Sequence, residues 1–354
     1  MLKQFSREYS VFLALITIIG MIFFEHSLAS TNLGNLLGFI LIFGVIIYSS
    51  ISVAHHAEKL AEKYGEPYGT LILTISAVIV EIIIIVVMMT HSGDVTLARD
   101  TIYAAVMLDI NGLLGIAAII GGIKYGEQAY NVDSSNSYLG MIITAVGIAM
   151  VIPHFITENH QTMYSIFVIV AFIALYAVFT KIQVSNHKYF FEYNEKEKVD
   201  HDTDHINAPL HITLLIGSIV MIGFLSEVLS VFMGHTLKEF ELPFAIGAVT
   251  VAIISASPEL ITAFRAALDN RMQTVVNIAL GASLATILLT VAAVLVISKI
   301  TGMEIVLALT PLQGVMMGLT ILVGIVNFSD GETNVLEGFL HFILFIVFIF
   351  LIFV

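Results

Sequence analysis

Two glutamates embedded in otherwise apolar segments are the residues of this sequence best placed to do chemistry. Glu81 ends the run GTLILTISAVIVE and Glu259 ends the run GAVTVAIISASPE, each twelve residues after a glycine. Carboxylates are hard oxygen ligands for cations such as Ca²⁺, and they also bind protons. Burial raises a carboxyl pKa, and a second acid nearby raises one of the two further. The pattern therefore predicts a site at which a cation and a proton compete.

Oxygen donors that could complete such a site lie in the same segments and in the segments that follow them. Pro258 directly precedes Glu259, and a proline inside a membrane helix frees a backbone carbonyl one turn back. For each hydroxyl or amide, a hydrogen bond within or between helices is as good an interpretation as ligation. Asp109 is a third deep acid, with a role in the site or in a proton path. The secondary candidates are Thr74, Ser76, Asp109, Asn111, Ser255, Ser257 and Ser283.

Four other features carry weaker hypotheses. Glu227 is expected to be an interfacial carboxylate, with a gating role as the alternative. His154 and His341 lie near the ends of apolar runs and are expected to be structural. The segment DHDTDH, from Asp200 to His205, is expected to be a solvated acidic loop, with metal or pH sensing as the alternative.

Composition places these residues in a membrane. Of the 354 residues, 58% are hydrophobic and 12% charged, against roughly 45–50% and about 25% in soluble domains. The apolar runs show no alternation of period two, so helices are favoured over a barrel. We predict an all-α integral membrane protein with about eleven spanning helices. They are expected at residues 9–28, 34–54, 69–90, 101–123, 138–156, 162–183, 209–233, 244–267, 274–298, 304–327 and 334–354.

Charge and missing motifs exclude several classes of function. The net charge of −13, with no cluster of Lys and Arg, argues against nucleic acid as a partner. The absence of cysteine excludes disulfides and cysteine-ligated metal centres. The sequence also lacks HExxH, and it has no GxSxG motif facing a histidine, which argues against an intramembrane hydrolase. We therefore expect neither an enzyme nor a bound cofactor.

Basic residues orient the chain in the membrane. With the N-terminus in the cytoplasm, eleven Lys and Arg residues fall on the inner side, and only Arg99, Lys238 and Lys299 fall outside. Because Lys and Arg accumulate in cytoplasmic loops, we predict this orientation, with the C-terminus outside. The first apolar run is interpreted as a spanning helix, with a cleaved signal peptide as the alternative.

The sequence also predicts an inverted repeat, an arrangement found in many transporters. The segments beginning RDTIYAAVMLDING at Arg99 and RMQTVVNIALGASLAT at Arg271 each follow one of the two acidic segments. We predict an extra N-terminal helix at 1–30, five-helix repeats at 31–183 and 209–354, and an acidic cytoplasmic loop at 184–208. Units with an odd number of crossings have opposite orientations, which places equivalent residues near the midplane.

Longer motifs resemble a known family. The stretches GEPYGTLILTISAVIVE, TLARDTIYAAVM, SPELITAFRAALDN and NIALGASLATILLTV closely resemble the ChaA-type calcium/proton antiporters of the cation/Ca²⁺ exchanger superfamily. The resemblance implies two inverted five-helix halves, with Glu81 and Glu259 as the two repeat acids and Ser257 and Pro258 in a serine-proline-glutamate element. The chain departs from the family pattern at VIVE, where many members carry polar residues before the acid, and at Asp109.

We therefore expect a secondary antiporter in the inner membrane of a bacterial or archaeal cell. It would exchange cytoplasmic Ca²⁺ for protons by alternating access around the two glutamates. An Na⁺(K⁺)/H⁺ antiporter that uses the same site is the alternative, and a passive cation channel is a more remote one. The expected partners are the lipid bilayer, the transported cations and protons.

Overall fold

The chain is almost entirely helical, as its composition predicts. The structure is a computed structural model, which describes residues 9–64, 68–183 and 206–353. Most of the acidic loop predicted at 184–208, including the segment DHDTDH, lies outside the described residues, as do Lys3 and Arg7.

In the described part of the chain, nine helical segments are long and apolar enough to cross a membrane, and two apolar helices are shorter. Together they match the eleven crossings expected from the apolar runs. The elements are α2 (Tyr9–Leu28), α3 (Asn32–Tyr64), α4 (Tyr68–Ser92), α5 (Leu97–Val106), η1 (Met107–Leu113), α6 (Leu114–Tyr125), β1 (Glu127–Ala129), α7 (Val132–Val146), η2 (Gly147–Val151), η3 (Ile152–Phe155), α8 (Glu158–Lys181), α10 (Ala208–Glu239), α11 (Ala245–Leu268), α12 (Met272–Ala285), η7 (Thr286–Thr290), α13 (Val291–Thr301), α14 (Pro311–Asn327), β2 (Glu332–Asn334) and α15 (Val335–Leu351).

The tenth helix begins later than the hydrophobic run predicts. The run suggests a helix from residue 304, but residues 302–310 are not helical and α14 begins at Pro311. The side chains and backbones of Thr310 and Gln313 bond reciprocally in a capping box, and proline occupies the first turn. Both features are typical of a helix start, because the first N–H groups have no partner within the helix. Hydrophobicity alone could not locate this boundary.

Two compact units make up the chain, and each is assembled from both sides of the central loop. Unit 1 comprises residues 1–97 and 200–258, and unit 2 comprises residues 98–199 and 259–354. The boundary thus falls inside α11, between Pro258 and Glu259. The division into two repeats at 31–183 and 209–354 stays a prediction.

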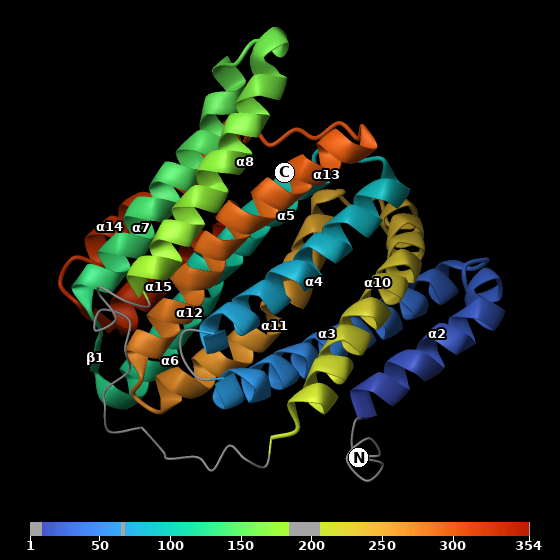
Figure 1. Cartoon of the computed structure of the whole chain (residues 1–354), viewed down its shortest axis with the longest axis horizontal. Helices are drawn as coiled ribbons and strands as arrows, with labels where there is room; N and C mark the ends of the chain where they lie inside the picture. Colours follow the sequence, from blue (N-terminus) through green and yellow to red (C-terminus); the bar gives the residue numbers. More distant parts are fainter. Residues whose placement is uncertain (1–8, 65–67, 184–205, 354) are drawn as a thin grey trace. The chain divides into compact units, whose positions relative to one another are not determined.

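Within unit 1, α3 and α10 pack together along their length and run antiparallel (Figure 1). At one end Asn35 Nδ2 donates to Glu239 Oε1 at 2.9 Å, and at the other the Nδ1 atoms of His56 and His211 are 3.0 Å apart. Between them, a Cβ on Gly38 would lie 2.6 Å from the Phe232 ring. The absence of a side chain at Gly38 therefore lets the large aromatic ring fill the space between the helices.

Within unit 2, α15 packs antiparallel against η1 and α6. A Cβ on Gly338 would lie 2.7 Å from the Ile119 nitrogen and 2.8 Å from the Gly115 carbonyl oxygen, so the two backbones touch here. Small residues allow such close approach between membrane helices. Beyond these helices, β1 and β2 form an antiparallel pair in which Gln128 lies opposite Thr333.

This close contact predicts a matched pair of stability effects. Gly338→Ala should lower the free energy of unfolding by about 1–3 kcal/mol, because the added methyl group meets backbone atoms that cannot rotate away. Gly318→Ala in α14 is the control, since nothing lies within 4 Å of its Cβ position. Thermal unfolding of the two variants in detergent measures the difference. Equal melting temperatures would contradict the proposed contact.

Candidate functional site

Glu81 lies in the middle of α4 and is almost completely buried. It is thirteen residues after Tyr68 and eleven before Ser92, so about 17–20 Å of helix extends on each side. Its side chain is 2% exposed. An acid at this depth is costly in a membrane and is by default a functional group.

The hydroxyl groups before Glu81 belong to the same helix. The Ser76 hydroxyl donates to the Ile72 carbonyl at 2.6 Å, and Thr74, two residues earlier, is half-buried. A hydroxyl that donates its proton to a carbonyl keeps lone pairs that can accept a hydrogen bond or bind a cation. Ser76 can therefore satisfy its own helix and still present an oxygen.

Glu259 occupies the equivalent place in α11, fourteen residues after Ala245 and nine before Leu268. It is half-buried. Pro258 lies inside this helix, and because proline has no N–H, the Ile254 carbonyl receives no bond from the position four residues on. The proline thus removes one regular helical hydrogen bond about one turn before the acid.

Two serine hydroxyls of α11 donate to their own helix just before that point. Ser257 donates to the Ile253 carbonyl at 2.5 Å, and Ser255 donates to the Ala252 carbonyl at 3.1 Å. Both oxygens keep acceptor capacity, as Ser76 does in α4. Hydroxyl and carbonyl oxygens beside an acid are the ligand types that hard cations accept.

In unit 2, the structure brings Asp109 and Ser283 together. Asp109 lies in η1, a π-helical segment, and is 2% exposed. The fully buried Ser283 hydroxyl of α12 donates to Asp109 Oδ2 at 3.2 Å. Two further π-helical segments are η2, which directly follows α7, and η7, which directly follows α12. Short π-helical segments often mark functional sites, and here each of the two segments beginning at Arg99 and Arg271 contains one.

Both polar atoms of the Asn111 side-chain amide have hydrogen-bond partners. Its Nδ2 donates to Thr320 Oγ1 at 2.7 Å, and its Oδ1 lies 3.0 Å from His341 Nδ1. All three side chains are buried. His341 is expected from the sequence to be structural. Its position as a lone polar residue inside an apolar run is a signal of a buried polar contact.

The candidates divide between the two units. Thr74, Ser76, Glu81, Ser255 and Ser257 belong to unit 1, while Asp109, Asn111, Glu259 and Ser283 belong to unit 2. The pairing of Glu81 with Glu259 stays a prediction. Within the described ranges, no group of three or more acids and histidines could hold a metal ion. A cation here would therefore need neutral oxygen ligands and water in addition to carboxylates.

Glu227 differs from the deep acids. Its side chain is 59% exposed, and Oε1 lies 3.5 Å from His91 Nε2. This exposure agrees with the interpretation of Glu227 as an interfacial carboxylate.

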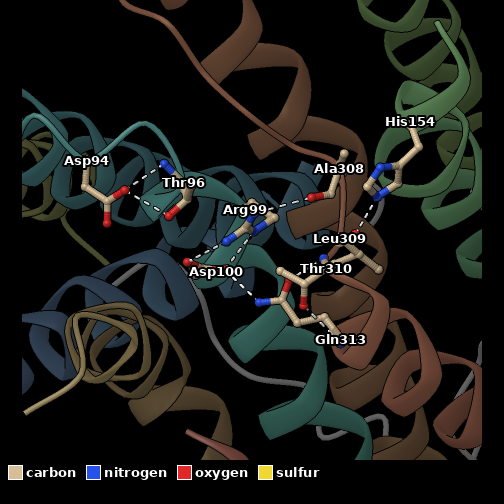
Figure 2. A network of polar contacts seen from close by, with 9 residues as sticks. All are labelled: Asp94, Thr96, Arg99, Asp100, His154, Ala308, Leu309, Thr310 and Gln313. Carbon is tan, nitrogen blue, oxygen red and sulfur yellow. Dashed lines mark hydrogen bonds and ion pairs between the residues drawn. The ribbon is translucent and has the colours of Figure 1, made fainter.

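A separate polar network in unit 2 holds the non-helical segment 302–310 (Figure 2). Arg99 bonds both carboxylate oxygens of Asp100, at 2.8 and 3.1 Å, and donates to the Ala308 carbonyl at 3.4 Å. Gln313 Nε2 donates to Asp100 Oδ1 at 2.7 Å. His154 Nε2 lies 2.5 Å from the Leu309 carbonyl, consistent with the structural role expected of it. From the sequence, Arg99 serves only to orient the chain, and its partners are not predicted.

Apolar helices with acids at the centres of two of them define an integral membrane transporter of cations. Comparison with known proteins agrees. The family model described as "Sodium/calcium exchanger protein" matches residues 34–185 and 210–354. The chain therefore belongs to the sodium/calcium exchanger family of the cation/Ca²⁺ exchanger superfamily, and it is an antiporter and not an enzyme. The gap in the match coincides with the acidic loop.

Relatives with curated names support the resemblance to ChaA-type antiporters. The "Sodium-potassium/proton antiporter ChaA" of Escherichia coli (strain K12) is 32% identical over 317 residues, covering 87% of this chain and 86% of that protein. The "Ca(2+)/H(+) antiporter ChaA" of Bacillus subtilis (strain 168) is 27% identical over 237 residues, covering 63% and 66%. The solved structure of native YfkE has a TM-score of 0.75 at 20% identity, covering 96% and 99%, and so shares the fold.

The Arg99 network predicts a difference between two aspartates that each pair with an arginine. Asp100→Asn should lower the free energy of unfolding by about 1–3 kcal/mol, because it leaves a nearly buried guanidinium without its counter-charge. Asp269→Asn is the control, since the Asp269 side chain is 63% exposed and surface ion pairs contribute little. The melting temperatures of the two variants in detergent measure their losses of stability. A larger loss for Asp269→Asn than for Asp100→Asn would refute the role assigned to the network.

Proposed function

We propose that this protein exports cytoplasmic Ca²⁺ in exchange for protons. The observation that carries the proposal is the pair of acids at the centres of α4 and α11, in a chain whose family consists of cation antiporters. Glu81 and Glu259 bind the cation and the protons. The secondary ligands are the hydroxyls of Thr74, Ser76, Ser255 and Ser257 and the carbonyl of Ile254.

Charge balance explains why exchange would be obligatory. Two ionised carboxylates carry a charge of −2, which one Ca²⁺ or two protons neutralise. A bare pair within the membrane is disfavoured by at least about 2.5–3.5 kcal/mol for each charge. The protein therefore switches between opening to the inside and opening to the outside only when the site holds Ca²⁺ or protons, and not when the site is empty. Protons compete with Ca²⁺, so the apparent affinity for Ca²⁺ falls as the pH falls.

Asp109 and Ser283 have a supporting role in this proposal. Their hydrogen bond places a third buried acid beside a hydroxyl of α12. A carboxyl and a hydroxyl can both pass a proton on, so these two residues suit the proton route. Asn111 has its amide engaged with Thr320 and His341, which favours a positioning role over direct ligation.

Exchange of Na⁺ or K⁺ for protons is the second candidate function. The Escherichia coli relative is named for these ions and is 32% identical, whereas the Bacillus subtilis relative named for Ca²⁺ is 27% identical. A monovalent cation at the same site would neutralise one carboxylate and leave the other protonated. The same oxygen ligands serve either ion.

Proton flux in inverted membrane vesicles tests the function directly. Adding Ca²⁺ to vesicles with an acidic lumen should dissipate the pH gradient, and Glu81→Gln or Glu259→Gln should reduce the rate at least about a hundredfold. The control is Glu227→Gln, the same chemical change at an exposed acid, which should leave the rate unchanged. Retained exchange in either glutamine variant of the deep acids contradicts a shared site. If Na⁺ or K⁺ dissipates the pH gradient and Ca²⁺ does not, the protein has the second candidate function.

The proposed orientation is testable because the chain has no cysteine of its own. Glu158 and Asp330 are both exposed, and they should lie on the outer and cytoplasmic sides respectively. Glu158→Cys should react with a membrane-impermeant maleimide in intact cells, and Asp330→Cys should react only after the membrane is broken. The reverse labelling pattern would invert the topology.

A further inference from the structure

His341 is a deeply buried histidine that the charge-balance mechanism does not use. It lies two turns into α15 and is 1% exposed. Its place follows from the glycine contact described above. Because α15 and α6 run antiparallel and touch at Gly338 and Gly115, His341, one turn after Gly338, reaches Asn111, one turn before Gly115.

The chemistry of the contact sets the direction of the hydrogen bond. An amide oxygen only accepts, so His341 Nδ1 carries the hydrogen and donates to Asn111 Oδ1 at 3.0 Å. On the other side, Asn111 Nδ2 donates to Thr320 Oγ1 at 2.7 Å and faces the Met107 sulfur at 3.5 Å. The amide is thus fixed in one orientation by α15 and α14 together.

The other nitrogen of the same ring makes no hydrogen bond within the described part of the chain that would stabilise the fold. Its Nε2 is buried and has no hydrogen-bond partner among the residues that the structure describes. A buried polar atom without a partner costs about 1–3 kcal/mol. The ring face stacks on Phe328, with centroids 5.8 Å apart, so an apolar side chain would pack here without that cost. What His341 adds is its single bond to Asn111.

Asn111 connects this bond to the acid of η1. The two residues lie in the same π-helical segment, with Asp109 two positions before Asn111. Ser283 of α12 meets Asp109 at 3.2 Å. Because a π-helical segment departs from regular helical bonding, side-chain contacts can decide its conformation. Asn111 is the residue of η1 that α14 and α15 hold from the side.

We infer that His341 is a positioning residue of the exchange site: through the amide of Asn111, it holds η1 in the conformation that presents Asp109 to Ser283. The inference rests on the proposed function, in which Asp109 serves the proton route. His341 contacts no transported ion in this assignment. Its effect on transport passes through Asn111.

Three substitutions at His341 separate the donor from the bulk of the ring. Asn places its amide nitrogen where His has Nδ1, Gln places it nearer to Nε2, and Leu has no donor. His341→Leu and His341→Gln should raise the apparent KM for the exchanged proton by about tenfold, because Asp109 serves the proton route, with kcat changed by less than about threefold. His341→Asn should restore KM to within about threefold of the unchanged protein. Equal KM values for the three variants would overturn the inference.

Phe348→Leu is the matched control for packing of α15. Phe348 is also buried on α15, and its ring packs against that of Tyr103 in α5. This variant should lower the melting temperature and leave KM unchanged. An equal rise in KM for Phe348→Leu and His341→Leu would show that general packing of α15, and not the bond to Asn111, sets the affinity.

A double-mutant cycle tests whether His341 acts through Asn111. If it does, His341→Leu should add less than about twofold to the KM of Asn111→Leu, because the bond is already gone. Additive effects would overturn the inference. The same cycle measured by melting temperature does not depend on transport. If the melting temperatures show coupling but the unchanged protein shows no cation-dependent proton flux, the proposed function alone is contradicted. If the flux requires Glu81 but His341 and Asn111 are not coupled, only this inference is contradicted.

Discussion

The cost of a bare carboxylate inside a membrane is the constraint on which this protein depends. Glu81 and Glu259 each lie near the middle of a helix that is otherwise apolar, where water cannot stabilise a charge. In the proposed exchange, such a group binds either a cation or a proton, and binding one displaces the other. Competition between cation and proton would then follow from burial and charge, without any requirement for a catalytic step.

Local departures from regular helix supply the polar atoms that such a site requires. A regular helix uses all its carbonyl oxygens internally, and so has no backbone ligands to offer. Pro258 removes the regular helical hydrogen bond to the Ile254 carbonyl about one turn before Glu259, and the π-helical segments η1 and η7 lie on the segments that follow the two acids. Among the π-helical segments, η1 contains the candidates Asp109 and Asn111 and η7 directly follows α12 with Ser283, whereas η2 contains no candidate residue.

In unit 2, close contact between two helix backbones brings polar side chains together. Gly115 and Gly338 let α6 and α15 approach until backbone atoms touch. That approach brings two polar side chains, Asn111 and His341, within hydrogen-bonding distance inside an apolar interior. Where helices are packed against each other by small residues, a single polar contact can fix the position of a whole turn.

The sequence by itself determined the features that depend on local composition. Eleven apolar runs predicted eleven helices, because each crossing must satisfy its own backbone. The acids and Pro258 were recognisable because charge and proline are rare within such runs. The longer motifs around them resemble the exchanger superfamily, and the family match confirmed this resemblance.

Only the tertiary structure decided which residues meet across helices. Hydrophobicity put the start of the tenth helix at 304, whereas the capping box at Thr310 sets it at Pro311. His341 looked structural because its partner, Asn111, lies 230 residues away. The Asp109–Ser283 bond and the Arg99 network likewise join distant segments. Composition cannot specify such pairings, because they depend on how closely and at which residues two helices pack.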